Sequence, residues 1–436
     1  GFFRYNFTDD RISFVRLQNN LLEEVKVHDI RNFVLDKLEE WDEVGIYNLV
    51  AENSKFKSEY LSHLKLLEPK FIKDDKHTSW CFYSNTAVKI TANNIECVDY
   101  KDLEGVIWKS EKLNREFKKS DFEKCDFNIF LKNLSNQDGE RYRALLSAIG
   151  YMLHRYKSPS TTKVVILNDE VISDEPAGGT GKTLVFQAMG KIRPVVIING
   201  KNFNDNKSFV WQRVNLDTAI VVLDDIPNGF KFMNLFSIIT TGWPIEKKNR
   251  GEIYLPPELS PKMGIPTNHS IRGRTDSFRR RKFELEINAH YSAAHQPVDE
   301  FGKEFWTSDW SEDDWLCFDN VMMYAVQQFI KDGFITPKFV NLEKKQLIAD
   351  TSEDFTEWAE FHLENNRMYK RNAMYKRFKE ENPETYIKDA KMFYRWMRIW
   401  GEYNGWKTAD AGQGKMYIQY GDEVASHVDN DNDLPF

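Results

Sequence analysis

One short segment constrains this chain more than any other: Gly178-Gly179-Thr180-Gly181-Lys182-Thr183, near the middle of the sequence. Glycines allow the backbone to wrap around an anion with several N–H groups pointing inward. A helix that begins at Lys182 would present its positive end to the same anion. In such a loop the lysine neutralises phosphates and the Thr183 hydroxyl binds Mg²⁺. The segment therefore predicts an ATP-binding loop between a strand and a helix.

The loop departs from the strict phosphate-loop pattern at its first position, where Pro176 replaces glycine. This departure affects the entry to the loop and leaves the Lys182-Thr183 pair intact. The alternative is a glycine-rich turn that only caps a helix. A capping turn does not require Lys-Thr directly after its last glycine, so the phosphate loop is favoured.

Short β-branched runs surround this loop. They occur at Lys163–Leu167, Val195–Asn199 and Ala219–Leu223, with helical patterns between them. Strand–helix alternation of this kind predicts an α/β fold with a parallel sheet.

Two carboxylates, Asp224 and Asp225, end the third of these runs. The carboxyl ends of parallel strands face the ligand crevice, and buried acids there need a cation or hydrogen bonds. We expect Asp224 to hold Mg²⁺ together with Thr183, and Asp225 to polarise the attacking water. The alternative is a solvated acid pair at the end of a strand.

Composition narrows the class of protein. The chain has 436 residues, 41% of them apolar, which is enough for about two to four folded domains. Its net charge of −7 excludes a uniformly basic nucleic-acid coat, so DNA contacts must come from local basic patches. The four cysteines are scattered without metal-site spacing, and no apolar run is long enough to cross a membrane. We expect a cytoplasmic protein without a membrane partner and, because residue 1 is glycine rather than methionine, a piece of a longer protein.

Four motifs follow one another within about 100 residues: Gly-Lys-Thr at 181–183, Asp224-Asp225, an apolar run that ends at Asn268, and Arg279-Arg280-Arg281. In this order the chain resembles superfamily 3 helicases, the viral and plasmid replicative AAA+ ATPases. The segments at 80–85, 107–109 and 148–154 resemble, more closely, the helicase part of phage primase–helicases of the poxvirus-primase-like branch. The chain itself shows no primase catalytic motif, so any primase would lie before Gly1.

The resemblance implies roles for the matching residues. Asn268 would sense the γ-phosphate. One of Arg279, Arg280 and Arg281 would be the arginine finger that reaches a neighbouring subunit's ATP, and we favour Arg280. Such a finger neutralises transition-state charge, so the ATPase would work only as a ring, hexameric in this family. The alternative for the three arginines is a solvated basic strand edge.

Two further sets of basic residues are candidate DNA contacts. The resemblance implies that Lys247 and Lys248, followed by Arg250, lie on a hairpin in the ring pore and hold the phosphates of one strand; an ordinary exposed lysine pair is the alternative. Residues 353–420 predict three helices and then a hairpin, the order of a winged helix. Residues 367–398 contain ten Lys or Arg against four Asp or Glu. The third helix would carry the DNA contacts Lys391, Arg395 and Arg398. The alternative is a structural cap with solvated charges.

These patterns divide the chain into six regions. The predicted regions are an N-terminal α+β region (1–118), a helical collar (119–160), the AAA+ core (161–290), a helical lid or connector (291–350), a winged-helix-like domain (351–420) and an acidic disordered tail (421–436). The tail ends in Leu434-Pro435-Phe436 and resembles the tip of bacterial single-stranded-DNA-binding proteins. It predicts either contact with a host replication protein or a merely solvating tail.

The sequence therefore predicts an ATP- and Mg²⁺-dependent DNA helicase of a phage or mobile element, located in the host bacterial cytoplasm. It would move 3′→5′ on single-stranded DNA at forks, as a homo-oligomeric ring. Three alternatives remain: a DNA-stimulated ATPase that acts as replication initiator or loader, a small-molecule phosphate-loop kinase, and a non-enzymatic DNA-binding regulator.

Overall fold

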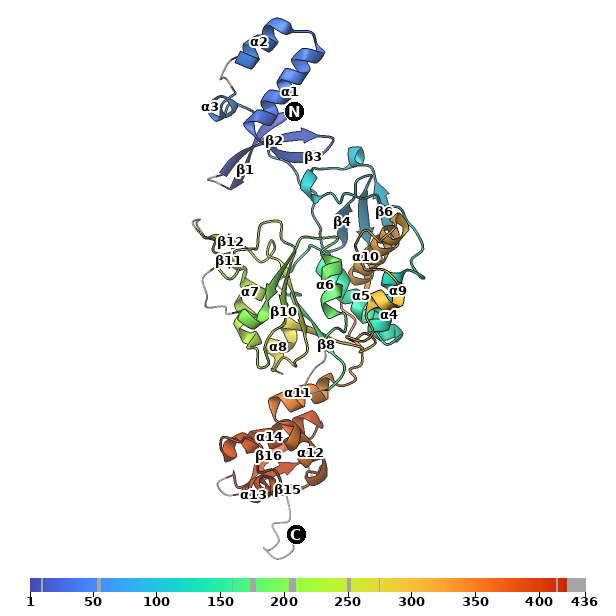
Figure 1. The fold of residues 1–436 in the computed structure, drawn as a ribbon. Helices are drawn as coiled ribbons and strands as arrows, with labels where there is room; N and C mark the ends of the chain where they lie inside the picture. The colour runs from blue at the N-terminus through green and yellow to red at the C-terminus, as the bar shows by residue number, and fades with distance from the viewer. Residues whose placement is uncertain are drawn as a thin grey trace, which may run out of the picture.

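The computed structural model describes residues 1–8, 11–52, 56–158, 160–172, 178–203, 209–248, 252–273, 275–412 and 415–421. Pro176, Arg250 and nearly all of the predicted tail, including Leu434-Pro435-Phe436, lie outside these ranges. The described chain forms an elongated series of units, with the N-terminal residues at one end and the C-terminal residues at the other (Figure 1). No helix among the described residues is long and apolar enough to cross a membrane.

The N-terminal region contains two small sheets and three helices. Strands β1, β2 and β3 are antiparallel, and the short β7 adds to β3 in parallel. A second antiparallel sheet has the order β4-β5-β6. The bounds are β1 Phe2–Thr8, β2 Arg11–Gln18, β3 Leu21–Val25, α1 Val27–Glu40, α2 Val44–Glu52, α3 Ser58–Leu61, β4 Thr78–Phe82, β5 Ala87–Thr91, β6 Ile95–Val98 and β7 Ile107–Trp108.

The centre of the molecule is a five-stranded sheet, in which every strand pair is parallel and the order is β14-β8-β13-β10-β9. The parallel α/β sheet predicted from the sequence is thus confirmed. The bounds of this part are β8 Val164–Asp169, α6 Lys182–Met189, β9 Val195–Asn199, β10 Ile220–Asp224, α7 Phe236–Thr241, β11 Trp243–Ile245, β12 Ile253–Leu255, β13 Lys262–Thr267, α8 Asp276–Arg281 and β14 Lys282–Ile287.

Helices cover both faces of this sheet, which explains why β8, β9 and β10 are largely apolar, whereas the edge strand β14 alternates charged and apolar residues. Along β8, Val165 and Leu167 point into one core, and Val164 and Ile166 point into the other. The first core is closed by α4 to α6 and by α10, and the second by α7 and by Trp211. The covering helices have the bounds α4 Asp126–Leu134, α5 Gly139–Leu153, α9 Pro297–Phe301 and α10 Glu312–Asp332.

The C-terminal region has a core of its own, built around Phe355, Phe378 and Phe393. Four helices pack there against a small antiparallel sheet of order β15-β17-β16. The bounds are α11 Leu342–Asp350, α12 Glu353–His362, β15 Met368–Lys370, α13 Arg371–Glu381, α14 Ala390–Tyr403, β16 Thr408–Ala411 and β17 Tyr417–Tyr420.

Some predicted bounds were wrong. For the hairpin within 353–420, the local pattern predicts strands at Trp406–Thr408 and Lys415–Ile418, but β16 and β17 begin two residues later, and β15 was not predicted at all. Both errors have one cause: β17 is the central strand, and its register against β15 and β16 is set by Ile418 and Tyr420, whose side chains are buried in the core. A local pattern carries no such long-range constraint.

Candidate nucleotide site

The phosphate loop lies where the sequence predicted it, between β8 and α6. Gly179 and Gly181 have φ of +95° and +90°, in the left-handed region that favours glycine. Gly181 is the residue before the first turn of α6, so the N–H groups at the start of that helix face the loop. This backbone can surround an anion at the carboxyl edge of the sheet.

Lys182 does not point into solvent. Its Nζ donates to Oδ1 of Asp169, the last residue of β8, and to Thr180 Oγ1 at 2.8 Å. Thr180 Oγ1 in turn donates to the same Asp169 oxygen at 2.7 Å. The side chains of Lys182 and Asp169 are each only 7% exposed. Burial lowers the pKa of Lys182, and the Asp169 carboxylate opposes that shift.

Thr183 and Asp224 are brought together from different elements. Thr183 Oγ1, in the first turn of α6, donates to Asp224 Oδ1 at 3.3 Å, at the end of β10. A hydroxyl and a carboxylate are the hard oxygen ligands that Mg²⁺ prefers. The Oδ2 atom of Asp169, on the same edge of the sheet, is buried and has no hydrogen-bond partner among the described residues. These residues fit a Mg²⁺–nucleotide site.

Asp225 differs from its neighbour in backbone and in contacts. Its φ is +59°, which turns the chain sharply after β10. Its carboxylate is exposed and pairs with Lys201 Nζ at 2.7 Å, just beyond the end of β9. The structure therefore directs Asp224 towards the phosphate loop and Asp225 towards the adjacent strand end. A water-polarising role for Asp225 would first require the Lys201 pair to open.

Asn268 follows directly after β13, the strand between β8 and β10. In the parallel register Thr267 lies beside Asn168, so Asn268 comes level with Asp169. The sheet thus brings Asn268 to the same edge as Lys182 and Asp224.

The three arginines lie at the opposite edge. They form the last turn of α8, directly before β14 begins, and Lys163 Nζ donates to the Arg279 carbonyl at 3.2 Å just before β8 begins. They are therefore separated from the phosphate loop by the length of β8, about 16 Å. The alternative of a basic strand edge was wrong in this respect, because these residues are helical.

The three arginine side chains also differ in their exposure and in their contacts. The Arg281 guanidinium lies 4.5 Å from the centre of the Phe236 ring and donates to the Ser277 carbonyl at 3.0 Å. Arg279 and Arg280 are exposed, and the Arg279 guanidinium makes a long contact of 3.9 Å with Asp276. The Arg281 side chain is thus held against α7 and α8, whereas the Arg280 side chain is exposed to solvent.

Lys247 and Lys248 lie on the connection between β11 and β12, which form an antiparallel hairpin. Lys248 is exposed, but Lys247 donates to Asn215 Oδ1 and is half-buried. The hairpin predicted from the sequence is present, and Lys248 is its freer lysine.

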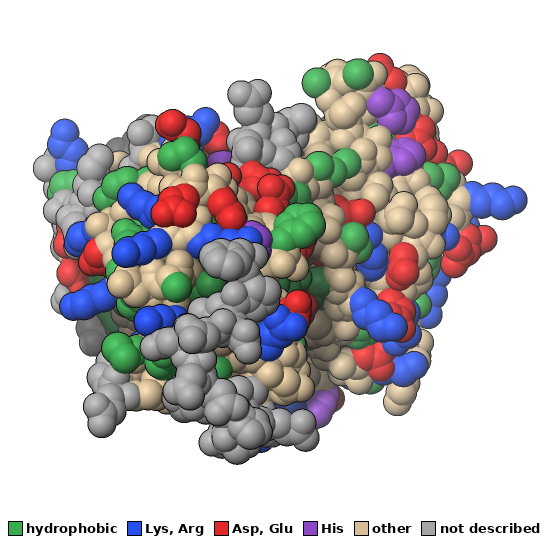
Figure 2. Space-filling view, turned by 90° about the horizontal axis from the view of Figure 1, so that it is seen from below, with side chains coloured by type: hydrophobic (Ala, Val, Ile, Leu, Met, Phe, Trp, Pro, Cys, Tyr) green, Lys and Arg blue, Asp and Glu red, His purple; other side chains and the backbone are tan. Residues whose placement is uncertain are grey.

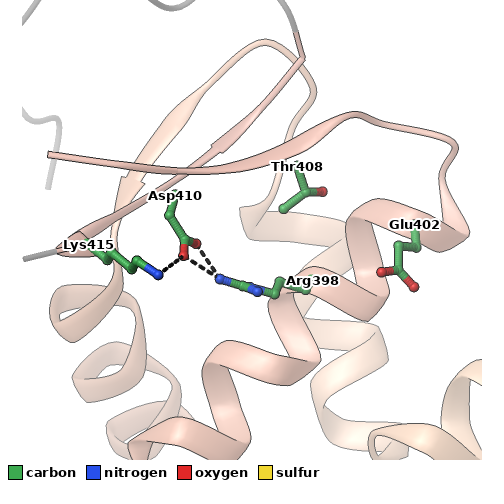
Figure 3. A pocket seen from close by; sticks show the side chains of 5 residues that line it. All are labelled: Arg398, Glu402, Thr408, Asp410 and Lys415. Carbon is green, nitrogen blue, oxygen red and sulfur yellow. Dashed lines mark hydrogen bonds and ion pairs between the residues drawn. The ribbon is translucent and has the colours of Figure 1, made fainter.

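The basic residues of α14 share one face, because Lys391, Arg395 and Arg398 are spaced by four and three residues and all are exposed. Their partners differ. Arg398 Nη2 donates to both oxygens of Asp410 at 2.5 Å, and Lys415 approaches the same carboxylate at 3.9 Å (Figure 3). Seen from the C-terminal end, basic side chains lie interspersed with acidic ones (Figure 2). Lys391 and Arg395 are therefore the better candidates for phosphate contacts.

Asp169 is the residue that the sequence analysis missed. It lies 13 positions before Lys182, and the only local signal was an Asn-Asp-Glu stretch after an apolar run. That stretch has the same form as the run that ends in Asp224-Asp225, which was recognised.

No family model matches the sequence, and no curated protein matches it. Among solved structures, the C-terminal region of NrS-1 aligns over 96% of this chain and 96% of that chain, at 14% identity and a TM-score of 0.41. JCV helicase aligns over 46% of this chain and 59% of that chain, at 13% identity and a TM-score of 0.27. Both TM-scores are too low to support a function for this chain, so a proposed function has to be based on the residues of the site.

Proposed function

We propose that this chain is the motor of an ATP-dependent superfamily 3 DNA helicase of the AAA+ class, working as a ring, hexameric in our proposal, on single-stranded DNA. One observation carries the proposal: a glycine-rich loop, Lys182 and Thr183 meet Asp224 at the carboxyl edge of a parallel sheet. A binding module would not need this combination of cation, hydroxyl and carboxylate around an anion site.

Each residue has a separate task in this proposal. The backbone N–H groups of 178–181 bind the phosphates, and Lys182 leaves Asp169 to neutralise them. Thr183 and Asp224 hold Mg²⁺, which when bound neutralises charge on the transferred phosphoryl group. Asn268 orients the attacking water from the neighbouring strand end.

The position of the arginines supports a site shared between subunits. Because they lie about 16 Å from the phosphate loop of their own chain, at the other edge of the sheet, they cannot neutralise its transition state. An exposed Arg280 on a second copy can. This is the physical reason for expecting activity only in an assembled ring.

DNA contact would come from two places. The β11–β12 hairpin carries the exposed Lys248, whose ammonium can neutralise phosphates whatever the base sequence, as a translocating enzyme requires. In the C-terminal region, helices α12, α13 and α14 and the small sheet support a winged helix whose α14 presents Lys391 and Arg395 to phosphates.

The test is ATP hydrolysis with and without single-stranded DNA, beside separation of a forked duplex. The wild-type chain should do both, and Lys182→Ala should do neither. Lys247→Ala combined with Lys248→Ala should keep basal hydrolysis and lose strand separation, while Lys231→Ala, at an exposed lysine outside the hairpin, should behave as wild type. DNA-stimulated hydrolysis without strand separation in the wild type would favour the initiator or loader, and absence of nucleotide hydrolysis would refute the proposal.

A further inference from the structure

A second group of chemically active side chains lies beside the phosphate loop. Residues 288–300, here called the strap, follow β14 and include the first four residues of α9. A Cβ atom built on Gly179 would lie 3.4 Å from the backbone nitrogen of Ala293, so the strap lies directly beside the loop. The strap contains two histidines and a glutamate, His290, His295 and Glu300.

The three side chains converge through their terminal atoms. His290 Nε2 lies 3.0 Å from Glu300 Oε2, and His295 Nε2 lies 3.7 Å from the same oxygen. All three candidate ligand atoms lie within 4.8 Å of one another. A tetrahedral Zn²⁺ with bonds of about 2.0–2.1 Å holds its ligand atoms about 3.3 Å apart. The measured separations bracket this value, so small side-chain rotations would close the site.

Hydrogen bonds from a neighbouring residue orient the Glu300 carboxylate, as is usual for a metal ligand. Asn133 Nδ2, from α4, donates to Glu300 Oε1 at 3.0 Å and to Oε2 at 3.2 Å, and to the Tyr291 hydroxyl at 2.9 Å. Asn133 therefore holds the Glu300 carboxylate in place from α4.

From this geometry we propose that His290, His295 and Glu300 bind one divalent cation of the zinc class. Two neutral imidazoles and one carboxylate form a donor set that this ion accepts, with a fourth position open to water. The site is distinct from the Mg²⁺ position at Thr183 and Asp224, whose ligands are all oxygens. Its ion would fix the strap against Gly179 and thereby hold the phosphate loop in shape.

The first measurement is metal binding by the full chain after treatment with EDTA, in a Cys97→Ser background that removes the exposed thiol. Zn²⁺ alone is added in competition with a chromophoric chelator, and Co²⁺ is added separately to record its visible absorption. We expect one tightly bound equivalent and a Co²⁺ spectrum typical of four or five ligands.

Variants assign that equivalent to the strap. His290→Ala combined with His295→Ala should lose it. Glu300→Gln should lose it as well, while keeping the side chain's shape and a hydrogen bond to Asn133. Asn133→Ala keeps all three ligands and should weaken binding about 10–100-fold. His28→Ala is the control, since His28 is an exposed histidine on α1 that also lies beside a carboxylate, and it should bind as wild type.

Two results would overturn the proposal. One is a wild-type chain that takes up no Zn²⁺ beyond non-specific binding, which would leave the three residues as a metal-free ion-pair cluster. The other is Zn²⁺ bound equally tightly by the wild type and by both ligand variants. Circular dichroism of each variant separates loss of ligands from loss of fold, and neither result bears on ATP hydrolysis at Lys182.

Discussion

The contact between Lys182 and Asp169 leads to a prediction with opposite effects on stability and on nucleotide affinity. The two side chains are each 7% exposed and share the Thr180 hydroxyl, so they form a buried ion pair. In the proposed function, ATP has to take Lys182 away from Asp169 before the lysine can contact phosphate. The substitution Asp169→Asn removes the carboxylate charge and keeps the shape and one acceptor oxygen.

The expected magnitudes follow from burial. Removing one member of a buried pair leaves the other charge uncompensated and costs about 3–5 kcal/mol. Asparagine can still accept a hydrogen bond from Lys182, so we expect the lower value, about 3 kcal/mol. For a folded domain of about 150–250 residues, that cost lowers the melting temperature by about 6–12 °C. Phosphate supplies the missing negative charge on binding, so ATP should bind Asp169→Asn up to about 100-fold more tightly.

The assay combines thermal unfolding, with and without ATP, and fluorescence titration of a labelled nucleotide. Glu170→Gln is the matched control, because Glu170 is the next residue and pairs with Arg141 at 2.7 Å instead of with Lys182. It should lower stability without changing nucleotide affinity. Adding Lys182→Met to Asp169→Asn should recover stability, since neither charge is then left unpaired.

The reasoning is refuted if Asp169→Asn is as stable as the wild type, or if its ATP affinity does not exceed that of Glu170→Gln. The first result would mean that the Lys182 ammonium is solvated without the carboxylate. The second would mean that Asp169 does not compete with phosphate for the lysine.

Three further predictions concern other parts of the molecule. Burial lowers the pKa of Lys157 to about 8, so as the pH rises the native state releases this proton before the unfolded state does. The free energy of unfolding of the wild type should therefore rise by about 3 kcal/mol between pH 8 and 10.5. Urea unfolding of Lys157→Met should show no such rise. Arg280→Ala should lower ATP hydrolysis about 10³-fold at unchanged melting temperature, whereas Arg281→Ala should mainly lower stability; the reverse pattern would make Arg281 the finger. Lys391→Ala and Arg395→Ala should each reduce the salt dependence of DNA binding by about one unit of slope, and an unchanged slope in titrations would exclude them as phosphate contacts.

The sequence predicted β8, β9 and β10 of the central sheet because these strands are nearly continuous apolar runs. Val195–Asn199 was predicted with its observed bounds, and the bounds of β8 and β10 differ by one or two residues. The edge strand β14 was not predicted, because charged residues alternate with apolar ones along it. The position of the glycine-rich segment between β8 and α6 was predicted for a similar reason, since its residues are adjacent in the sequence. Where a structural requirement is local, the sequence displays it directly.

The parts that were missed depend on contacts between distant segments. Asp169 contacts Lys182 only because β8 ends beside the start of α6. There the buried Lys182 side chain pairs with the last residue of β8. Nothing in an isolated Asn-Asp-Glu stretch distinguishes such a carboxylate from a solvated one. His290, His295 and Glu300 are likewise separated by five residues each, a spacing that fits no regular helix or strand face.

The three arginines show that residues adjacent in sequence can also have different surroundings in the fold. Their proximity in sequence suggested three equivalent candidates, whereas the fold makes them unequal. One turn of α8 is enough to place Arg281 against the Phe236 ring and to leave Arg280 exposed. Because adjacent helical side chains point about 100° apart, a run of identical residues on a helix cannot all face the same partner. Which of the three arginines can act as a finger therefore depends on where its side chain points. The packing of α8 on α7 sets that direction, and the arginine run itself does not.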